Sequence, residues 1–435
     1  MTSVAHRLTP TLKRMILWCA AMALAACSDS SDNGFAATER YLVSTFQVTF
    51  VDDSRGTPAT GDFPALPNRT LETTVLMPEG RGSFPLLVFS HGLGSSPQAY
   101  EALLEEVAAN GFTVVAPLFP LTGQNAPAGA DPADTQNQPG DVSFLIDAVS
   151  AAVASGQAPF DSRTDTTNIG TFGHSNGGIT TLGVVANSCC SDARIDAAVS
   201  MSAAAAPYNS GEYDFSAAMP LMLVHGTLDT LIPYEESVRV FNNVAAAKGI
   251  VTLTDVGHTE FLLPSGQGFT TTANSIIDFF STQLRDDVVA QQRLIDGTTY
   301  DTATEVLYSP EGGTDVTLPL PPPITNRVAS VEPSTDLVDG QIVTVAWLNF
   351  TPENVVNIVQ CSEVGTGGNE VCSFDNALIL QPNPTGDGSL QMEIIVGDVG
   401  SGRCDATTDD CVIVVNDGGL LGEDAILRIP ISFRP

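Results

Sequence analysis

A serine flanked by glycines is the part of the chain whose spacing best suits covalent chemistry. The pentad Gly173-His-Ser-Asn-Gly177 follows an apolar run at 168–172 and precedes a helix-like segment at 177–186. Where a strand turns into a helix within one residue, the serine hydroxyl is exposed at the positive end of the helix, and flanking glycines permit the close backbone approach. The pattern predicts that Ser175 is a nucleophile; the alternative is that Ser175 only caps the helix.

A serine hydroxyl needs a base and an orienting acid, and both follow in the chain. Asp229 lies just beyond the strand-like run 220–225, and His258 lies in the loop after the next run, 250–254. The order serine, acid, histidine differs from that of chymotrypsin and subtilisin, so the order itself separates fold types. We therefore predict Ser175 as nucleophile, Asp229 as orienting acid and His258 as base.

Other residues compete for the acid and base roles. If Asp229 were only a turn or cap residue, Asp255 or Glu260 would be the substitute acid. His91, His174 and His225 sit beside loop or elbow backbone, where histidines more often brace the chain than take part in chemistry. These three histidines are therefore predicted to be structural.

A glycine-rich loop follows the first central apolar run. The segment Phe89-Ser-His-Gly-Leu-Gly-Ser95 ends this run, and its glycines allow backbone N–H groups to turn toward the serine. Preorganised donors of this kind are worth about 3–4 kcal/mol each in the barrier of an acyl transfer. The N–H groups of Leu93 and Asn176 are the predicted oxyanion-hole donors.

The elements that must position these residues alternate along the chain. Two alternating runs, 41–51 and 71–77, precede continuous apolar runs that suit strands buried on both faces. These runs are 85–90, 112–117, 168–172, 195–201, 220–225 and 250–254. Helix-like segments lie between them, at 97–110, 141–154, 177–186, 234–247 and 273–284, the last extending toward 295. The alternation predicts an α/β fold with a doubly wound, mostly parallel sheet.

A second, all-β domain is predicted at the C-terminal end. The helical pattern ends near Gly297, and an acidic, proline-rich stretch at 298–327 reads as a linker. Short Val/Ile-rich runs between turn residues then predict a smaller immunoglobulin-like β-sandwich at 328–435. The catalytic domain is assigned to 41–297.

The N-terminus is typical of an export signal. A basic stretch precedes twelve uncharged, mostly apolar residues at 15–26, too few to span a bilayer comfortably. Leu24-Ala-Ala-Cys27 resembles a bacterial lipobox, which implies cleavage of a 1–26 signal peptide, lipidation of Cys27 and a tether at 27–40. An ordinary signal peptide with a free Cys27 is the alternative. We expect an exported protein, anchored by lipid to the bacterial cell envelope, at the outer membrane, or extracellular.

Charge and cysteine usage restrict the partners. With 17 Lys and Arg against 50 Asp and Glu, the net charge of −33 repels nucleic acid and anionic membrane surfaces, so membrane contact is expected through the lipid alone. The acidic residues Glu212, Asp214 and 131–141 match no calcium-loop spacing and are read as solvated turns. No zinc-type cysteine spacing occurs either, so no metal and no cofactor is expected.

Six cysteines remain after Cys19 and Cys27 are assigned to the signal and the lipid. An even number in an oxidising compartment suggests disulfides. The adjacent Cys189 and Cys190 could form a vicinal disulfide or stay as buried thiols, and the sequence does not choose between these states.

The motifs 85–95, 138–144, 173–178, 225–233 and 257–261 together resemble the α/β-hydrolase fold, over about residues 41–295. Within it the chain is similar to the group containing platelet-activating-factor acetylhydrolases, dienelactone hydrolases and bacterial polyester hydrolases. The resemblance implies serine carboxylic-ester hydrolysis through an acyl-enzyme, with Ser175, Asp229 and His258 matching the family's triad. Dienelactone hydrolases use a cysteine nucleophile, and polyester hydrolases have an aromatic residue where this chain has Leu93.

The chain between two predicted strands is too short for a sizeable cap. Only eighteen residues, 202–219, separate the run at 195 from the run at 220, where many relatives carry helices. We expect an open pocket that accepts small to medium acyl groups.

The C-terminal region resembles the neocarzinostatin-type chromophore-binding sandwich, over about 328–433. The similarity lies in the segments 331–345 and 358–361, in the remaining cysteines and in the closing residues 430–433. It implies two local disulfides, Cys361–Cys372 and Cys404–Cys411. The aromatic residues of the family's ligand cleft are not clearly retained; only Trp347, Phe350 and Phe374 are available. A spacer or substrate-adhering module is the preferred interpretation.

Together these features predict a monomeric serine esterase that needs only its ester substrate. Two alternatives stay open at this point: an amidase or peptidase with the same triad, and a non-catalytic surface binding protein built on the same scaffold.

Overall fold

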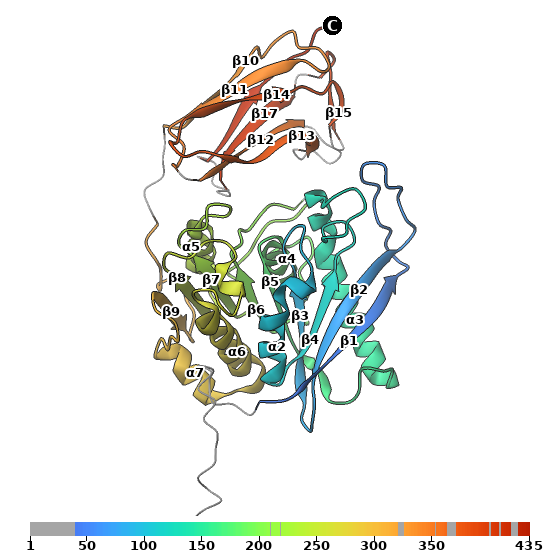
Figure 1. Ribbon diagram of the computed structural model, residues 1–435, viewed down its shortest axis with the longest axis vertical. Coiled ribbons are helices and arrows are strands. Elements are labelled where there is room, and N and C mark those ends of the chain that lie inside the picture. Colours follow the sequence, from blue (N-terminus) through green and yellow to red (C-terminus); the bar gives the residue numbers. More distant parts are fainter. Residues whose placement is uncertain are drawn as a thin grey trace, which may run out of the picture. The chain divides into compact units, whose positions relative to one another are not determined.

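The computed structural model of the protein describes residues 40–208, 210–217, 219–320, 326–352, 354–362, 371–399, 402–408, 410–418 and 425–435 (Figure 1). The predicted signal peptide at 1–26, the lipidation of Cys27 and most of the tether lie outside these residues. Within these ranges, no helix is both long and apolar enough to cross a membrane.

A nine-stranded mixed sheet forms the scaffold of the larger domain. Its spatial order is β1-β2-β4-β3-β5-β6-β7-β8-β9. The strands β3 to β8 run parallel, and the pairs β1/β2, β2/β4 and β8/β9 are antiparallel. The bounds are β1 Val43–Asp52, β2 Arg69–Pro78, β3 Phe84–Ser90, β4 Thr113–Leu118, β5 Thr164–His174, β6 Ala197–Met201, β7 Leu221–Gly226, β8 Lys248–Leu253 and β9 Thr304–Ser309. The predicted α/β class and mostly parallel sheet are confirmed.

Helices cover both faces of this sheet (Figure 1). Helices α2 (Glu101–Ala109) and α6 (Phe269–Arg285) contact each other and the strands beneath them. Helices α3 (Gln138–Ser155), α4 (Asn176–Ala186) and α5 (Tyr234–Asn243) share one apolar cluster with the sheet. Because both faces are covered, every residue of β3, β6 and β7 is buried, which explains their mostly apolar sequence.

The predicted linker at 298–327 contains a strand of the nine-stranded sheet. Residues Thr304–Ser309 form β9, which pairs antiparallel with β8 from Leu253↔Thr304 to Lys248↔Ser309. The assignment of this stretch to a linker is therefore corrected. This edge strand alternates between buried and exposed residues, so β9 lacks the apolar run that marks the central strands.

The last predicted helix is in fact two helices. Asp286 adopts a left-handed conformation with φ 54° and ends α6. The Asp287 carboxylate then accepts hydrogen bonds from the N–H groups of Val289 and Ala290 at 2.9 and 3.1 Å, and so caps α7 (Val288–Ile295).

The C-terminal domain is all β. A three-stranded sheet, β10 (Val328–Glu332), β11 (Ile342–Leu348) and β14 (Gly388–Glu393), and a four-stranded sheet contribute to one buried apolar core. The second sheet has the order β13-β12-β17-β18, and β15 pairs with β16. The bounds of these strands are β12 Val355–Ser362, β13 Val371–Pro382, β15 Gly397–Val399, β16 Gly402–Cys404, β17 Cys411–Asp417 and β18 Ile426–Pro430. The predicted sandwich is confirmed.

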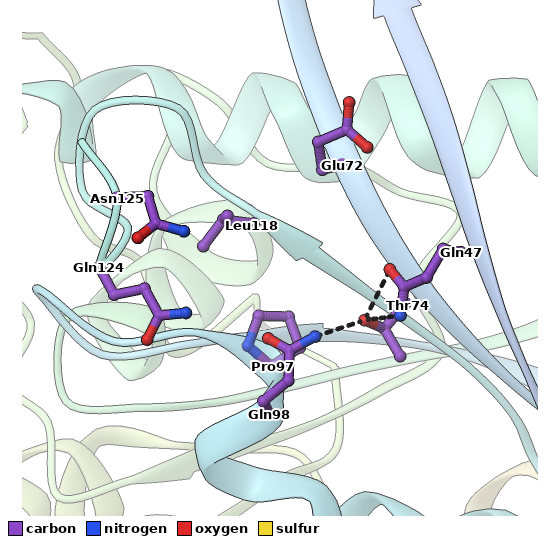
Figure 2. Close-up of a pocket in the computed structure, with 8 residues that line it drawn as sticks. All are labelled: Gln47, Glu72, Thr74, Pro97, Gln98, Leu118, Gln124 and Asn125. Carbon is purple, nitrogen blue, oxygen red and sulfur yellow. Dashed lines mark hydrogen bonds between the residues drawn. The ribbon is translucent and has the colours of Figure 1, made fainter. Parts of the chain in front are cut away.

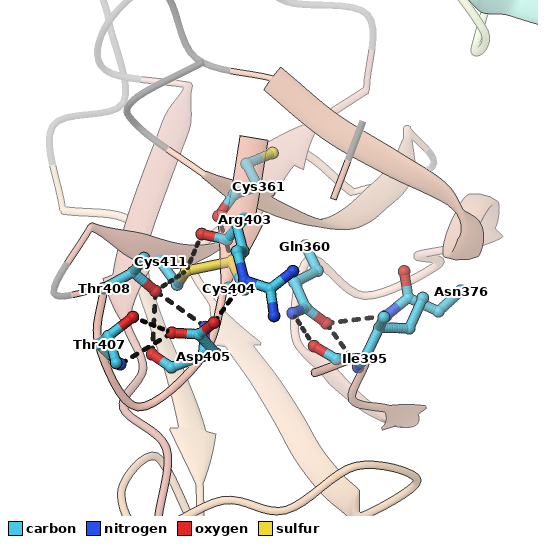
Figure 3. The surroundings of a disulfide bond; sticks show 10 residues. All are labelled: Gln360, Cys361, Asn376, Ile395, Arg403, Cys404, Asp405, Thr407, Thr408 and Cys411. Carbon is cyan, nitrogen blue, oxygen red and sulfur yellow. Dashed lines mark hydrogen bonds and ion pairs between the residues drawn. A yellow bond between two sulfur atoms is a disulfide. The ribbon is translucent and has the colours of Figure 1, made fainter. Parts of the chain in front are cut away.

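Both implied cysteine pairs of this domain lie at disulfide distance. Cys361 and Cys372 are cross-strand partners of β12 and β13, and Cys404 is joined to Cys411. Figure 3 shows the second bond beside Asp405, whose carboxylate accepts hydrogen bonds from the backbone and hydroxyl of Thr407. In the catalytic domain, Cys189 and Cys190 are bonded to each other, which resolves the alternative that the sequence left open.

Candidate active site

The three predicted triad residues follow the carboxyl ends of nearby strands. Ser175 follows β5, Asp229 follows β7 and His258 follows β8, and these strands lie in the order β5-β6-β7-β8. Since parallel strands end at the same edge of a sheet, segments about 30 to 80 residues apart in the chain converge there. The oxyanion loop enters the same edge from β3, the neighbour of β5.

Ser175 sits on a sharp turn in which the positions two residues before and after it have room only for glycine. Its backbone has φ 55° and ψ −122°, a conformation that a residue with a side chain adopts at a cost. A Cβ on Gly173 would lie 2.2 Å from the carbonyl oxygen of Gly177, and a Cβ on Gly177 would lie 2.0 Å from that of Ser90. The Ser175 N–H donates to Met201 O on β6 at 2.9 Å, which fixes the turn against the sheet.

The predicted acid and the predicted base are in direct contact. His258 Nδ1–H donates to Asp229 Oδ2 at 2.6 Å, and the His258 side chain is 13% exposed. Asp229 Oδ1 accepts two backbone hydrogen bonds at 3.0 Å, from Leu231 and Ile232. Burial alone would raise the pKa of Asp229, but the hydrogen bonds from His225 and His258 outweigh it and hold that pKa well below its ordinary value. The carboxylate is therefore ionised and keeps His258 in the Nδ1–H tautomer.

A second histidine braces the acid. His225 Nε2–H donates to Ile232 O at 2.8 Å and lies 3.2 Å from Asp229 Oδ2, while its Nδ1 accepts from Ser237 Oγ at 2.7 Å. The partners on both sides fix the orientation of the ring and the direction of each hydrogen bond. The expectation that His225 is structural fits this arrangement.

The nucleophile and the base are not hydrogen-bonded in this structure. Among the described residues, neither Ser175 Oγ nor His258 Nε2 has a hydrogen-bond partner within 3.5 Å. The His258 ring packs against His174, the neighbour of Ser175, with 4.8 Å between ring centroids. In free enzymes the catalytic hydrogen bonds are often long and tighten only around substrate, so the lack of this bond is compatible with the predicted pair.

The two substitute acids lie elsewhere. Asp255 is exposed, and the Glu260 carboxylate accepts from the Thr259 N–H at 3.2 Å. Neither side chain contacts His258 by a hydrogen bond among the described residues. The geometry thus favours Asp229 as the partner of the base.

A buried relay connects the base to the oxyanion loop. The Gly92 N–H donates to Tyr100 Oη at 3.0 Å, and Tyr100 Oη donates to His174 Nδ1 at 3.0 Å. His174 Nε2–H then donates to the carbonyl oxygen of His258 at 2.8 Å. Burial, followed by the nearby His258 charge, lowers the pKa of His174 to about 3, so this ring is neutral at physiological pH.

The two predicted oxyanion donors are unengaged. The Leu93 N–H has no acceptor among the described residues, whereas the neighbouring Gly92 and Gly94 N–H groups are both used. Asn176 begins α4, where a backbone N–H has no intrahelical partner. A Cβ on Gly92 would lie 3.4 Å from Ser175 Cβ, so the loop passes close to the serine.

One buried side chain, Gln138, connects the two oxyanion segments, and sequence reasoning missed it. Gln138 Nε2 donates to Thr122 Oγ1 at 2.6 Å, and Thr122 O accepts from the Gly94 N–H at 2.8 Å. Gln138 Oε1 accepts from Asn176 Nδ2 at 3.2 Å and from Thr180 Oγ1. The only sequence signal for Gln138 was its place in a motif of the resembling family.

The acidic loop at 131–141 is not simply a solvated turn, which corrects that interpretation. Asp134 and Asp141 are fully buried against Arg69, with N–O distances of 2.9 and 2.6 Å. Thr135 in the same loop donates to Asn176 Oδ1 at 2.7 Å. The ion cluster therefore anchors the segment that holds the first residue of α4.

A polar cavity opens beyond the oxyanion loop (Figure 2). Its volume is about 270 Å³, and its lining comes from β1, β2, the end of β4, the loop after β4 and the first turn after the oxyanion loop. The hydrogen bonds drawn in Figure 2 join Thr74 to Gln47 and Gln98.

Two family models match the chain, one in each domain. The chlorophyllase family model matches residues 45–227, which include the oxyanion loop and Ser175. The neocarzinostatin family model matches residues 329–433. Curated proteins give no significant match to the chain. The two matches confirm the architecture that the resemblance implied, a hydrolase-like domain followed by a neocarzinostatin-like domain.

Proposed function

We propose that this protein, hydrolase-like at its N-terminal end and neocarzinostatin-like at its C-terminal end, is a serine carboxylic-ester hydrolase that works through an acyl-enzyme. The chlorophyllase family match supports an ester hydrolase in general. The observation that carries the finer proposal is the 2.6 Å contact between His258 and Asp229, at the sheet edge where Ser175 occupies its strained turn. A nucleophile, a base and an orienting acid are the parts that acyl transfer needs.

Each group has a defined part in the reaction. Ser175 Oγ attacks the ester carbonyl carbon while His258 Nε2 takes the hydroxyl proton, and ionised Asp229 stabilises the resulting imidazolium. The N–H groups of Leu93 and Asn176 donate to the oxygen that becomes negative. His258 then gives its proton to the departing alcohol. A water molecule, deprotonated by His258, attacks the acyl-enzyme, releases the acid and restores Ser175.

We expect small to medium acyl groups to be the preferred substrates. The described residues between β6 and β7 form no helix, and Leu93, at the oxyanion position, is 44% exposed. An aliphatic residue here offers no aromatic ring to clamp a polymer, so polyester hydrolysis is not favoured.

The proposal includes an envelope location. The lipobox-like Leu24-Ala-Ala-Cys27 supports a lipid anchor that holds the enzyme at the membrane. Expression of the full chain in a bacterial host tests this, because Cys27→Ser should move the protein from the membrane fraction to the soluble one. Equal membrane retention of both proteins would contradict the anchor.

Hydrolysis of a p-nitrophenyl acyl ester, together with labelling by a fluorophosphonate probe, tests the enzyme assignment. Ser175→Ala should remove most turnover and all labelling, whereas Ser83→Ala, at an exposed serine, should keep both. A Ser175→Ala protein as active as the parent would overturn the assignment, and an unlabelled parent would favour a binding protein. The same protein assayed on a matched anilide separates esterase from amidase activity.

A further inference from the structure

The cavity beyond the oxyanion loop shares its backbone with that loop. The Gly94 N–H donates to Thr122 O at 2.8 Å, and the Gln124 N–H donates to Ser95 O at 2.7 Å. Gln124 lines the cavity, and Gln98 follows the loop by three residues. In the sheet order β2-β4-β3-β5, the cavity lies on one side of β3 and Ser175 follows the strand on the other side. A group bound in the cavity is therefore adjacent to the segment that carries Leu93.

The lining is rich in uncharged hydrogen-bonding groups and holds one carboxylate. Five of its residues carry amides or a hydroxyl: Gln47, Thr74, Gln98, Gln124 and Asn125. One carboxylate, Glu72, is held by Thr49 Oγ1 at 2.9 Å. Pro97 and Leu118 supply the apolar surface, and the lining includes neither a cationic nor an aromatic side chain.

Part of this hydrogen-bonding capacity is unused. The side chains of Gln124 and Asn125 are exposed and have no hydrogen-bond partner in the described chain. Gln98 Nε2 reaches Thr74 Oγ1 only at 3.4 Å, near the limit for such a bond. These amides can donate and accept toward a ligand without first breaking strong internal contacts.

The lining chemistry excludes most ligand classes. An anion would meet Glu72 and no balancing cation, on a protein with a net charge of −33. A long alkyl chain or an aromatic ring would remove water from the amides without forming hydrogen bonds to them, which is unfavourable. An uncharged group that carries several hydroxyls fits this lining well, because side-chain amides, a hydroxyl and one carboxylate are suitable partners for it.

The size of the cavity suits one compact ring. Its 270 Å³ lies just below the range of about 300–1,000 Å³ typical of drug-sized ligands. A second cavity of about 90 Å³ shares Gln47, Thr74, Pro97 and Gln98, reaches Thr45 on β1 and Glu101 on α2, and includes the apolar side chains of Leu76 and Leu104. A linked second ring would therefore find one further hydroxyl, that of Thr45, on β1.

We propose that this cavity is a substrate subsite for a neutral sugar, so that the enzyme acts on esters of uncharged carbohydrates. The inference rests on the proposed ester hydrolysis and adds the class of the esterified partner to it. The cavity positions the sugar while Leu93 and Asn176 receive the ester carbonyl.

The test compares two acetyl esters on the full chain. The ratio of kcat/KM for acetylated glucose to that for p-nitrophenyl acetate isolates the sugar contribution, because both esters form the same acetyl-enzyme. The double variant Gln98→Ala/Gln124→Ala should lower this ratio about tenfold, as expected when two neutral hydrogen bonds are lost. Gln291→Ala, in a separate cavity formed by α6 and α7, should leave the ratio unchanged. Acetylated glucuronic acid should be a poorer substrate than acetylated glucose for the parent.

Three outcomes would overturn the sugar subsite. The ratio could stay unchanged in the double variant, it could fall equally in Gln291→Ala, or the parent could prefer the acetylated glucuronic acid. None of them is a failure of the esterase assignment itself, which would show instead as Ser175→Ala hydrolysing p-nitrophenyl acetate as fast as the parent.

Discussion

Gln138 Nε2 donates to Thr122 Oγ1 at 2.6 Å, so one fully buried amide connects the loop after β4 to the first turn of α4. Each of these segments holds one proposed oxyanion donor in place, Leu93 through the Thr122–Gly94 hydrogen bond and Asn176 through its own side chain. A displacement of either donor weakens binding of the transition state more than binding of the ester, because the negative charge develops only in the reaction.

We therefore expect Gln138→Leu to lower kcat on p-nitrophenyl acetate about 10- to 100-fold with little change in KM. Gln138→Glu retains the oxygen that accepts from Asn176 and Thr180 but loses the donor to Thr122, so its loss should be smaller. Steady-state kinetics on both variants, with far-ultraviolet circular dichroism to confirm folding, decides the matter. A rise in KM with unchanged kcat would assign Gln138 to ground-state binding instead.

The elements that the sequence predicts best are those buried on both faces. The run from Phe84 to Ser90 is recognisable because its whole length is covered, and a nucleophile turn is recognisable because Gly173 and Gly177 are sterically required. The contact between Asp229 and His258 follows from the order of residues after parallel strands.

The parts that could not be predicted depend on contacts between distant segments. Arg69 and Asp141 are 72 residues apart, and nothing in the local spacing of either residue indicates a buried ion pair. Strand β9 was missed because its pairing partner, β8, lies some fifty residues earlier in the chain and only one of its edges is paired. Tyr100 gives no local signal at all, since its role depends on where Gly92 and His174 meet.

Removal of Arg69 should strongly destabilise the catalytic domain. Arg69 pairs with Asp134 and Asp141, and all three side chains have no solvent exposure. Arg69→Met would leave two buried carboxylates without their main partner, which costs about 3–5 kcal/mol. Arg194→Met is the matched control, because Arg194 is 41% exposed and its pairs with Asp147 and Asp192 contribute less, about 0–1 kcal/mol. Urea unfolding followed by far-ultraviolet circular dichroism measures both, and equal effects would contradict a special role for the buried cluster.

As the pH falls, the free energy of unfolding of the larger domain should decrease at pH values above those at which its carboxylates become protonated. Burial lowers the pKa of His91 to about 4, and His91 Nε2 accepts from the Phe119 N–H at 3.1 Å, a bond that protonation would break. His174 behaves alike, with a pKa of about 3. Because both folded values lie below the unfolded value of about 6.5, the unfolded state binds more protons, and stability is lost as the pH falls below about 6.5.

Each of these histidines contributes a slope of up to about 1.4 kcal/mol per pH unit in the free energy of unfolding. Unfolding measured at pH values between about 5 and 7 should show this decline. His91→Asn should reduce the slope by up to about 1.4 kcal/mol per pH unit, which corresponds to one bound proton. A slope that is identical in the variant and the parent would mean that His91 is not neutral in the folded protein.

Loss of the Cys404–Cys411 disulfide should destabilise the C-terminal sandwich domain selectively. The fluorescence of one tryptophan can report the unfolding of this domain. Trp347 is buried, with its Nε1–H donating to Asn383 Oδ1 at 3.0 Å, and the chain's other tryptophan, Trp18, belongs to the predicted signal peptide. Cys404 and Cys411 are 7 residues apart in sequence, and closing so short a loop stabilises the folded state by about 2–3 kcal/mol on the chain-entropy estimate. Cys404→Ala/Cys411→Ala should therefore shift the urea midpoint of Trp347 fluorescence downward. The far-ultraviolet circular dichroism of the helices should keep its midpoint, because the described helices all belong to the catalytic domain. A shift of both signals together would show that the two domains unfold as one unit.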